Sequence, residues 1–357
     1  MAATSTLDKP RPLPTTVPQH LARSAESWHG TIAPDGPFTP QKDRYHLYIG
    51  LFCPFAHRAN IVRHLFKLQD VLPLSVVRPY PKGDDSGWPG WRFPKTADEY
   101  PNATVDHIFG SEYLHEIYFK ADPKYKGRYS VPALWDKKTN TMVNNESAEM
   151  MRWLQKAYDG VIDTGREAMA LYPQHLRGVI DEVSEWMQRD LNGGVYKAGF
   201  AETQEDYDKN VLPVFAAMNR VEKMLFANGG PFLLGKALTE LDVRAYCTLV
   251  RFDPVYVQHF KVNLGTVRHD YPQINNWLKM LYESIPGFKE TTNFKHIKEN
   301  YTKSHSGINP KAITPMGPYP DVEDGWEADV QKVKVGGVMM KEVLELEKKL
   351  SGGFVNS

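Results

Sequence analysis

Cys53 is the residue whose type and position most directly indicate reactive chemistry. It follows the aromatic and β-branched run 45–52, which predicts a strand, and precedes Pro54, which suits the first position of a helix because proline lacks an N–H that would be unpaired there. A thiol at a helix N-terminus faces free N–H groups and the positive end of the helix dipole, which lower thiol pKa values to roughly 3.5–7.5. His57 and Arg58 in the next turn could add positive charge. We therefore predict a thiolate nucleophile, although most cysteines are buried and inert.

The other cysteine, Cys247, lies far along the chain in an apolar helical pattern, and we interpret it as a core residue. Position 56 is alanine, so Cys-Pro-Phe-Ala lacks the second thiol of a Cys-x-x-Cys motif. A disulfide formed by Cys53 in turnover must then be resolved by a thiol from outside. This predicts a small-thiol cosubstrate.

Two dipeptide motifs could bind a ligand. Val131-Pro132 places proline in a strand-like run, which fits either a cis peptide that turns the Val131 backbone toward a ligand or a trans proline in an edge strand. Glu146-Ser147 opens a helical pattern, where a hydroxyl and backbone N–H groups can bind a carboxylate, or where serine is a plain N-cap. The residues alone leave both alternatives open.

Other polar residues give weaker signals. Tyr196, Tyr256 and Tyr301 lie in glycine-rich or aromatic stretches, where tyrosines usually pack with a satisfied hydroxyl. The 12 histidines show no metal-ligand spacing, and 2 cysteines form neither a disulfide scaffold nor a thiolate zinc site. We therefore predict no metal site.

The elements that must position Cys53 form a mixed α/β unit. A long loop at 79–102 interrupts it, rich in proline and glycine and containing Trp88 and Trp91, which favour a functional loop. Hydrophobic periodicity predicts strand, helix, strand, helix, a strand hairpin and a helix, in this order: 45–52, 55–68, 74–77, 113–118, 130–136 with 141–143, and a helix after Ser147.

Beyond residue 171 the pattern is almost wholly helical, with stretches at 176–191, 205–226, 240–250, 272–285 and 293–301. The fold class is thus α/β followed by all-α. We expect four parts: an irregular proline-rich arm at 1–41, the mixed α/β domain at 42–160, an all-α domain at 170–318, and a peripheral extension at 319–357 with a charged helix at 341–350.

Composition narrows the functional class. Lys and Arg number 43, as do Asp and Glu, so the formal net charge is zero, which argues against a nucleic-acid binder. No apolar run reaches the roughly 18–20 residues of a membrane helix, and residues 1–20 lack the apolar core of a signal peptide. We expect a soluble protein of a reducing compartment, the cytoplasm, without nucleic-acid or membrane partners.

Cys-Pro after a first strand, Val-Pro before a hairpin and Glu-Ser at a helix start resemble, in this order, the thioredoxin-like domain of glutathione transferases. The helical remainder resembles the C-terminal domain of that family. More narrowly, 42–318 resembles the glutathionyl-hydroquinone reductases, the Xi class, which is related to the Omega class. The resemblance rests on these motifs: 53–58 (CPFAHR), 90–93, 121–123, 127–138, 143–149, 194–201, 251–256, 296–301 and 308–310.

The resemblance implies a two-step thiol transfer with glutathione as cosubstrate and no tightly bound cofactor. The Cys53 thiolate attacks the sulfur of a glutathionyl-hydroquinone, releases the hydroquinone and keeps glutathione as a mixed disulfide. A second glutathione resolves that disulfide and leaves as oxidised glutathione. The resemblance also implies that the protein removes glutathione from its conjugates in the detoxification of quinones. It further implies that the protein is a homodimer.

The resemblance assigns residues to both ligands. For glutathione they are Trp91, Arg128, Tyr129, Ser130 and Val131, with the Val131 backbone on its cysteinyl part, and Glu146 and Ser147 on its γ-glutamyl end. For the quinone, Tyr196 would donate a proton to the ring carbon that loses sulfur. Tyr256 and Tyr301 would line the quinone site and lower the pKa of Cys53.

The chain departs from the family pattern at Phe55, where tryptophan is usual. Trp88 is an alternative to Trp91 for the glutathione contact, and the segment after Pro320 has no counterpart. Two other functions stay open: an Omega-like thioltransferase or dehydroascorbate reductase, and a non-catalytic ligand-binding protein on the transferase fold. A reactive thiol together with three tyrosines favours an enzyme.

Overall fold

Four short strands form one mixed sheet in the order β2-β1-β3-β4. The central strand β1 runs parallel to β2 and antiparallel to β3, and β3 pairs antiparallel with β4. The computed structural model describes residues 28–80, 90–163, 165 and 169–318. The strands are β1 (Tyr45–Ile49), β2 (Leu74–Val76), β3 (Ala133–Asp136) and β4 (Thr141–Asn144).

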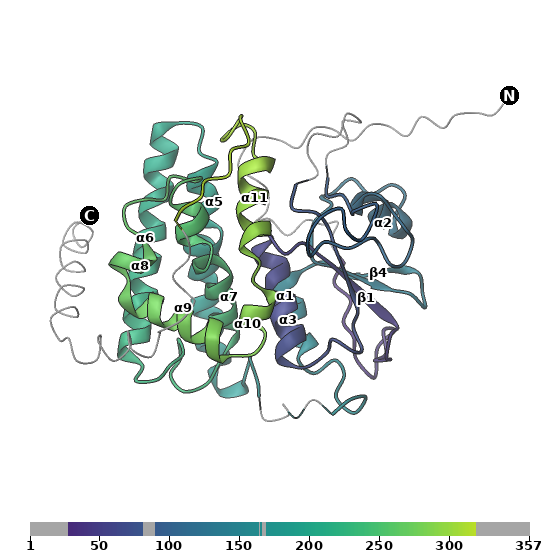
Figure 1. Cartoon of the computed structure of the whole chain (residues 1–357). Helices are drawn as coiled ribbons and strands as arrows, with labels where there is room; N and C mark the ends of the chain where they lie inside the picture. Colours follow the sequence, from purple (N-terminus) through teal and green to yellow (C-terminus); the bar gives the residue numbers. More distant parts are fainter. Residues whose placement is uncertain (1–27, 81–89, 164, 166–168, 319–357) are drawn as a thin grey trace.

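Three helices complete this thioredoxin-like domain, in the order that the sequence predicts. Every residue of β1 and β3 is buried, which fits central strands covered on both faces. Helices α1 and α3 lie on the side of the sheet that faces the helical part of the chain, and α2 lies on the other side (Figure 1). Their bounds are α1 (Pro54–Leu65), α2 (Leu114–Ala121) and α3 (Ser147–Leu154).

The last part of the N-terminal arm extends the sheet instead of being wholly irregular. The Gly30 N–H donates to Val143 O at 2.7 Å, and His29 forms a bridge with Asn144, so this segment covers the free edge of β4. Trp28 and Asn145 hold each other through two hydrogen bonds, from the Trp28 N–H to Asn145 Oδ1 at 3.0 Å and from the Asn145 N–H to Trp28 O at 3.2 Å. Residues 1–27 of the arm predicted at 1–41 and the whole predicted extension at 319–357 lie outside the described residues.

The rest of the described chain is helical, as predicted, with differences in detail. The stretch predicted at 176–191 ends in a π-helical turn, and α6 continues through Pro213. The short helices α5, α8 and α10 are additional to the prediction, because too few residues form a periodic pattern in each. The elements are η2 (Gln174–Leu176), α4 (Arg177–Trp186), η3 (Met187–Asn192), α5 (Gly194–Gly199), α6 (Gln204–Ala227), α7 (Glu240–Leu249), η4 (Phe252–Tyr256), α8 (Val267–Asp270), α9 (Pro272–Ser284), α10 (Phe288–Thr291) and α11 (Phe294–Ser304).

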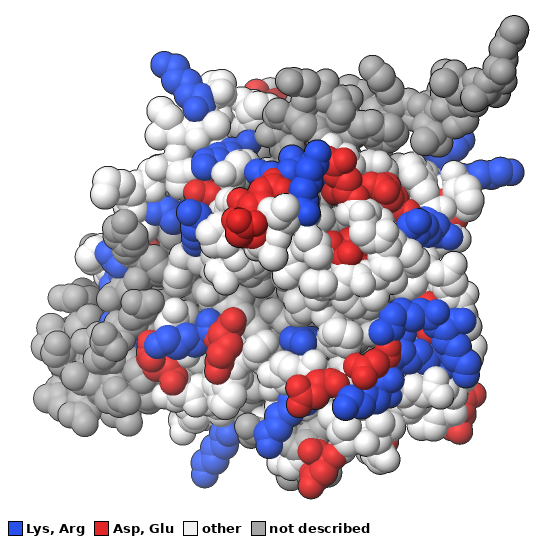
Figure 2. All heavy atoms as spheres, turned by 45° about the vertical axis from the view of Figure 1, so that its right-hand side comes forward, with Lys and Arg blue, Asp and Glu red and all other residues white. Residues whose placement is uncertain are grey.

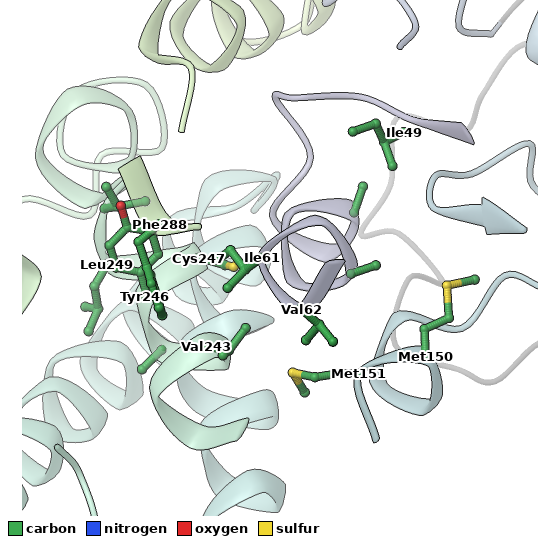
Figure 3. Packing of buried hydrophobic residues seen from close by; sticks show 14 of the residues in the cluster. Ile49, Ile61, Val62, Met150, Met151, Val243, Tyr246, Cys247, Leu249 and Phe288 are labelled. Atoms are coloured by element: carbon green, nitrogen blue, oxygen red, sulfur yellow. The ribbon is translucent and has the colours of Figure 1, made fainter. Parts of the chain in front are cut away.

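Helix α1 joins the two domains. Ile61 points toward Cys247 of α7, while Val62 lies near Met151 of α3 and Val243 of α7 (Figure 3). All five side chains are buried, and Cys247 is a core residue as predicted. The helix that begins at Cys53 is therefore fixed from both sides by apolar packing.

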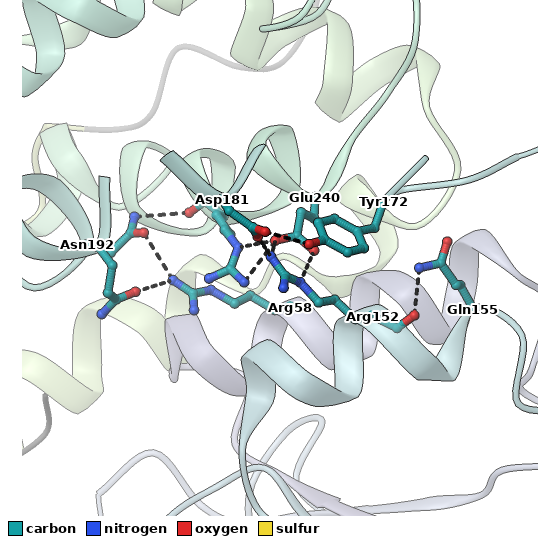
Figure 4. Close-up of polar contacts among 9 residues, drawn as sticks. Arg58, Arg152, Gln155, Tyr172, Asp181, Asn192 and Glu240 are labelled. Atoms are coloured by element: carbon teal, nitrogen blue, oxygen red, sulfur yellow. Dashed lines mark hydrogen bonds and ion pairs between the residues drawn. The ribbon is translucent and has the colours of Figure 1, made fainter. Parts of the chain in front are cut away.

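A polar network, buried at Glu240 and Arg244 and open to solvent at Asp181, crosses the same interface (Figure 4). Arg152 of α3 donates to both carboxylate oxygens of Glu240 on α7, each at 2.8 Å, and to Asp181 of α4 at 2.5 Å. Arg244 also donates to the fully buried Glu240, at 3.1 Å. Glu240 thus has two cationic partners, which offset the cost of burying its charge.

Buried histidines predict a loss of stability in acid. His46 and His259 are 2% and 3% exposed, and burial lowers the pKa of each from 6.5 to about 4. Since the folded pKa lies below the unfolded one, the unfolded chain binds the extra protons, and stability falls as the pH drops from about 6.5 toward 4. We expect each histidine to contribute at most about 1.4 kcal/mol per pH unit within this window. Urea unfolding at several pH values should show the slope, and His46→Gln should reduce it; an equal slope in that variant would contradict the assignment.

Charged side chains of both signs cover the surface. Lys and Arg are interspersed with Asp and Glu on the face shown in Figure 2, in line with the balanced composition. Within the described segments, the helices are too short or too polar to cross a bilayer.

Candidate active site

Cys53 is the N-cap residue of α1, where the sequence predicts it. Its N–H donates to Gly50 O at 2.9 Å, which closes the turn after β1. The Ala56 N–H donates to the sulfur at 3.5 Å, and the thiol donates to Val131 O at 3.4 Å. The residue is half-buried, so the sulfur lies between the helix start and the Val131 backbone.

The pKa of the Cys53 thiol differs from the prediction. Burial raises the pKa of the thiol above its ordinary value and outweighs the N–H groups of Ala56 and Phe55 and the positive charges of Arg251 and Arg58, which lower it. The predicted helix-terminus effect is present, but the predicted net lowering is wrong, because desolvation disfavours the thiolate.

Of the two residues that could add positive charge beside Cys53, His57 does not. His57 is buried, and burial together with Arg251 lowers its pKa well below 6.5, so the ring is neutral. Its Nε2 lies 2.8 Å from Thr291 Oγ1 and its Nδ1 lies 3.1 Å from the Arg251 guanidinium. Arg58 remains a cation, since burial lowers its pKa only to about 10.

The Val131-Pro132 peptide is cis, the first of the two alternatives for this motif. The segment before it is held by two tyrosines that the sequence did not single out. Tyr118 donates to Ser130 O at 2.7 Å and accepts from the Ser130 N–H at 3.2 Å. Tyr125 donates to Arg128 O at 3.1 Å.

Tyr129 lies within an aromatic cluster in the same segment. Its ring centroid is 5.5 Å from that of Phe119, 5.6 Å from that of His115 and 5.7 Å from that of Tyr118. The segment assigned to glutathione, 128–131, is therefore held by tyrosine hydroxyls on the backbone on either side of Tyr129 and by ring contacts around Tyr129 itself. Its contact with glutathione stays a prediction.

Trp91 lies beside the turn that leads into Cys53. Its ring centroid is 4.3 Å from that of Phe52, and its carbonyl accepts the N–H of Leu114 at the start of α2. The side chain is half-buried. The alternative residue, Trp88, lies outside the described residues.

Glu146 and Ser147 lie at the N-terminus of α3. Glu146 occupies the N-cap position and its side chain does not cap the helix, while Ser147 is the buried first helical residue. A plain serine N-cap is therefore not what the structure shows. The Glu146 N–H donates to Asn144 Oδ1 at 2.7 Å, and the neighbouring Asn145 is held by Trp28. The arm thus supports this helix start, a role that its irregular sequence pattern does not reveal.

Three separate helical elements bring the tyrosines together. Tyr301 of α11 lies between Tyr196 of α5, to which it hydrogen-bonds, and Tyr256 of η4, whose hydroxyl is 3.1 Å away. Phe55 of α1 stacks on Tyr196, with ring centroids 6.4 Å apart. The two domains therefore meet at the start of α1, where Phe55 links the helix that follows Cys53 to the tyrosine cluster.

All three tyrosines are held in the protonated form. Burial is the largest cause that raises the pKa of Tyr196, Tyr256 and Tyr301. Cys53 also raises the pKa of Tyr196 and Tyr256, as expected of acids that lie close together. In the described residues the hydroxyls bond one another and the sulfur bonds Ala56 and Val131, so the lowering of the Cys53 pKa by Tyr256 and Tyr301 stays a prediction.

The described residues contain no group of three or more His, Cys, Asp or Glu that could hold a metal ion. The site instead offers a half-buried thiol, a cis-proline segment beside it, a helix N-terminus and protonated phenols. These are suited to binding an anionic thiol peptide and to transferring a proton to a leaving group.

Two family models match the chain. That of the glutathione S-transferase N-terminal domain matches residues 52–157, and that of the C-terminal domain matches residues 204–279. "Glutathione S-transferase omega-like 2" of Schizosaccharomyces pombe is 52% identical over 303 residues, 84% of this chain and 94% of that protein. "Glutathionyl-hydroquinone reductase YqjG" of Escherichia coli is 42% identical over 317 residues, 87% of this chain and 92% of that protein.

Solved structures of glutathione transferases are also similar to this chain. The Xi glutathione S-transferase of Phanerochaete chrysosporium superposes with a TM-score of 0.79 at 46% identity, over 84% of this chain and 93% of that chain. The glutathione-bound structure of YqjG from Escherichia coli gives a TM-score of 0.78 at 43% identity, over 85% and 96% of the two chains. The chain therefore belongs to the glutathione S-transferase family and, within it, to the Xi class of the glutathionyl-hydroquinone reductases.

Proposed function

We propose that this protein reduces glutathionyl-hydroquinones to hydroquinones through a mixed disulfide between Cys53 and glutathione. The observation that carries the proposal is the meeting of the two domains at one thiol: α1 presents Cys53, and Phe55 two residues later stacks on Tyr196 of the helical domain. A thiol-transfer enzyme needs a nucleophile and, for a carbon leaving group, a proton donor. Cys53 and Tyr196 are our candidates for these two roles.

The first step is a displacement at sulfur. The Cys53 thiolate attacks the glutathionyl sulfur, the carbon–sulfur bond breaks, and its electron pair goes to the hydroquinone ring carbon. Tyr196 supplies the proton to that carbon, because its raised pKa keeps the phenol protonated at neutral pH. The Tyr301 hydroxyl hydrogen-bonds to the Tyr196 hydroxyl, as donor or as acceptor, and holds Tyr196 in place.

In the second step a glutathione thiolate attacks the mixed disulfide. Oxidised glutathione leaves, and Cys53 returns as a thiolate. Each turnover therefore consumes one free glutathione, which joins the glutathionyl group of the conjugate in the oxidised product. The lack of a neighbouring cysteine supports this external resolution. Cys247, the other thiol, is fully buried in α7 and has a pKa raised by burial to about 12.

Glutathione is expected along the edge formed by the cis-proline segment and α3. The Val131 backbone would pair with its cysteinyl part next to Cys53, and the N-terminus of α3 at Glu146 and Ser147 would bind its γ-glutamyl carboxylate. Trp91, Arg128, Tyr129 and Ser130 would complete the site. The glutathione-bound structure of the Escherichia coli relative supports glutathione as the cosubstrate. We also propose a cytoplasmic homodimer that acts in quinone detoxification.

The test is intact-protein mass spectrometry after incubation with a glutathionyl-hydroquinone, with release of free hydroquinone measured in parallel. We expect a glutathione adduct on Cys53 that forms as hydroquinone appears and disappears when glutathione is added. If the conjugate binds without adduct or release, the protein is a ligand-binding member of the family. If only simple glutathione mixed disulfides react, it is an Omega-like thioltransferase.

A further inference from the structure

Arg251 is a buried cation that contacts the turn leading into Cys53. It follows α7 and is 0% exposed. Its Nε donates to Phe52 O at 3.1 Å and its guanidinium donates to Leu51 O at 3.4 Å, so it holds the two residues that immediately precede the nucleophile. It also donates to Cys247 O at 2.6 Å and contacts Nδ1 of the neutral His57 at 3.1 Å.

The partners of Arg251 are all neutral. Among the described residues no carboxylate lies within ion-pair distance of it, whereas the buried Arg44 pairs with Asp136 at 2.6 Å and Arg244 pairs with Glu240 at 3.0 Å. Burying a cation without a counterion is costly, and such a charge favours the ionised form of any acid close to it. The positive charge of Arg251 does lower the pKa of Cys53, more strongly than Arg58 does.

The other groups around Cys53 do not supply the missing anion. On α1, His57 is neutral, and the Arg58 guanidinium, which hydrogen-bonds to the neutral Gln188 and Asn192, adds positive charge. The carboxylate that acts on Arg58, Glu240, is already paired with Arg152 and Arg244. Cys247 of α7 has a pKa of about 12 and stays a thiol. On α5, η4 and α11, burial keeps the three phenols protonated: Tyr196, Tyr256 and Tyr301. A thiolate at Cys53 is therefore the anion that these buried cations favour.

We propose that Arg251 is a positioning residue for the nucleophile: it fixes the Leu51–Phe52 carbonyls before Cys53 and provides the buried positive charge that the thiolate balances. This inference rests on the proposed function, in which Cys53 must ionise. It assigns a role to a residue nearly two hundred positions away in sequence, in the other domain. The helical domain would thus contribute to the nucleophile as well as to the tyrosine cluster.

The test measures the thiol directly. The rate of alkylation of Cys53 by iodoacetamide is followed against pH by peptide mass spectrometry, which separates Cys53 from the buried Cys247. The midpoint is the pH at which alkylation reaches half of its maximal rate. In Arg251→Gln, which keeps an amide donor but removes the charge, we expect this midpoint to rise by about one pH unit or more, which corresponds to about tenfold slower alkylation at pH values below it. In Arg251→Lys, which keeps the charge, we expect the midpoint to stay close to that of the unaltered protein.

Arg63→Met is the matched control. Arg63 is also buried and also bonds backbone carbonyls, Leu72 O at 2.6 Å and Gln69 O at 3.3 Å, but it lies ten residues along from Cys53, about 15 Å away at the helical rise. Its loss should leave the midpoint unchanged. An unchanged midpoint in Arg251→Gln overturns the inference. A rise of about one pH unit or more in Arg251→Lys, measured against the unaltered protein, also overturns it, and this outcome decides the test even if Arg251→Gln does not fold. Because alkylation needs no hydroquinone substrate, a failure here is distinct from a failure of the proposed reaction.

Discussion

Replacement of Cys53 by serine is expected to lower the rate of hydroquinone release by at least about 10³-fold, while glutathione still binds. A serine hydroxyl is a far weaker nucleophile toward sulfur and cannot form a mixed disulfide with glutathione. The contacts assigned to glutathione come from the cis-proline segment and from α3, which the substitution does not alter. Release of hydroquinone gives the rate, and calorimetric titration with glutathione gives the affinity.

Cys247→Ser is the matched control for this substitution. Cys247 is 0% exposed in α7, so its loss changes core packing and leaves the reaction chemistry in place. We expect turnover within a few-fold of the unaltered protein once a modest loss of stability is allowed for. Full turnover by Cys53→Ser would remove this thiol from the mechanism and show that another group of the protein carries the reaction.

The order and type of the main elements could be predicted because each one combines periodicity with a clear boundary signal. The strand that ends before Cys53, the helix that starts at Pro54 and the long helix α6 are found within a few residues of their predicted limits. Pro54 marks a helix start by its missing N–H, and this single constraint also places the thiol at the N-cap.

The features that sequence reasoning missed depend on contacts between distant segments. Arg251 meets Phe52 and Leu51 across the domain interface, and Trp28 meets Asn145 across the sheet edge, so neither pair leaves a local pattern. Tyr118 and Tyr125 read as ordinary aromatic core residues, although their hydroxyls hold the backbone of the glutathione segment. Only the position of the motif 251–256 in the family resemblance could have drawn attention to Arg251.

The pKa of Cys53 shows why a local argument was insufficient. The helix N-terminus acts as predicted, but the degree of burial is a property of the assembled domains, and burial has the larger effect. The positive charges that lower the pKa against this effect of burial come from Arg58 on α1 and from Arg251, which follows α7. The pKa of Cys53 therefore depends on the packing of both domains and not on the Cys-Pro motif alone.

Tyr196→Phe is expected to slow the release of hydroquinone from its glutathione conjugate by roughly 10²–10⁴-fold, the usual contribution of a positioned proton donor. The same variant should react almost normally with a mixed disulfide of glutathione and a small thiol. There the leaving group is a thiolate that needs no proton on carbon, so only Cys53 chemistry is required. The ring of Tyr196 is kept, and with it the stacking on Phe55.

The contrast between the two substrates separates proton donation from a general defect. A distorted site would slow both reactions, whereas loss of the donor slows only the one in which a carbon–sulfur bond breaks. Tyr45→Phe is the control for loss of a buried phenol, because Tyr45 lies at the far end of β1 and donates to Thr39 O at 2.8 Å. Equal slowing with both substrates in Tyr196→Phe would assign this tyrosine to binding, and Tyr301, its hydrogen-bond partner, would become the next phenol to test as the donor.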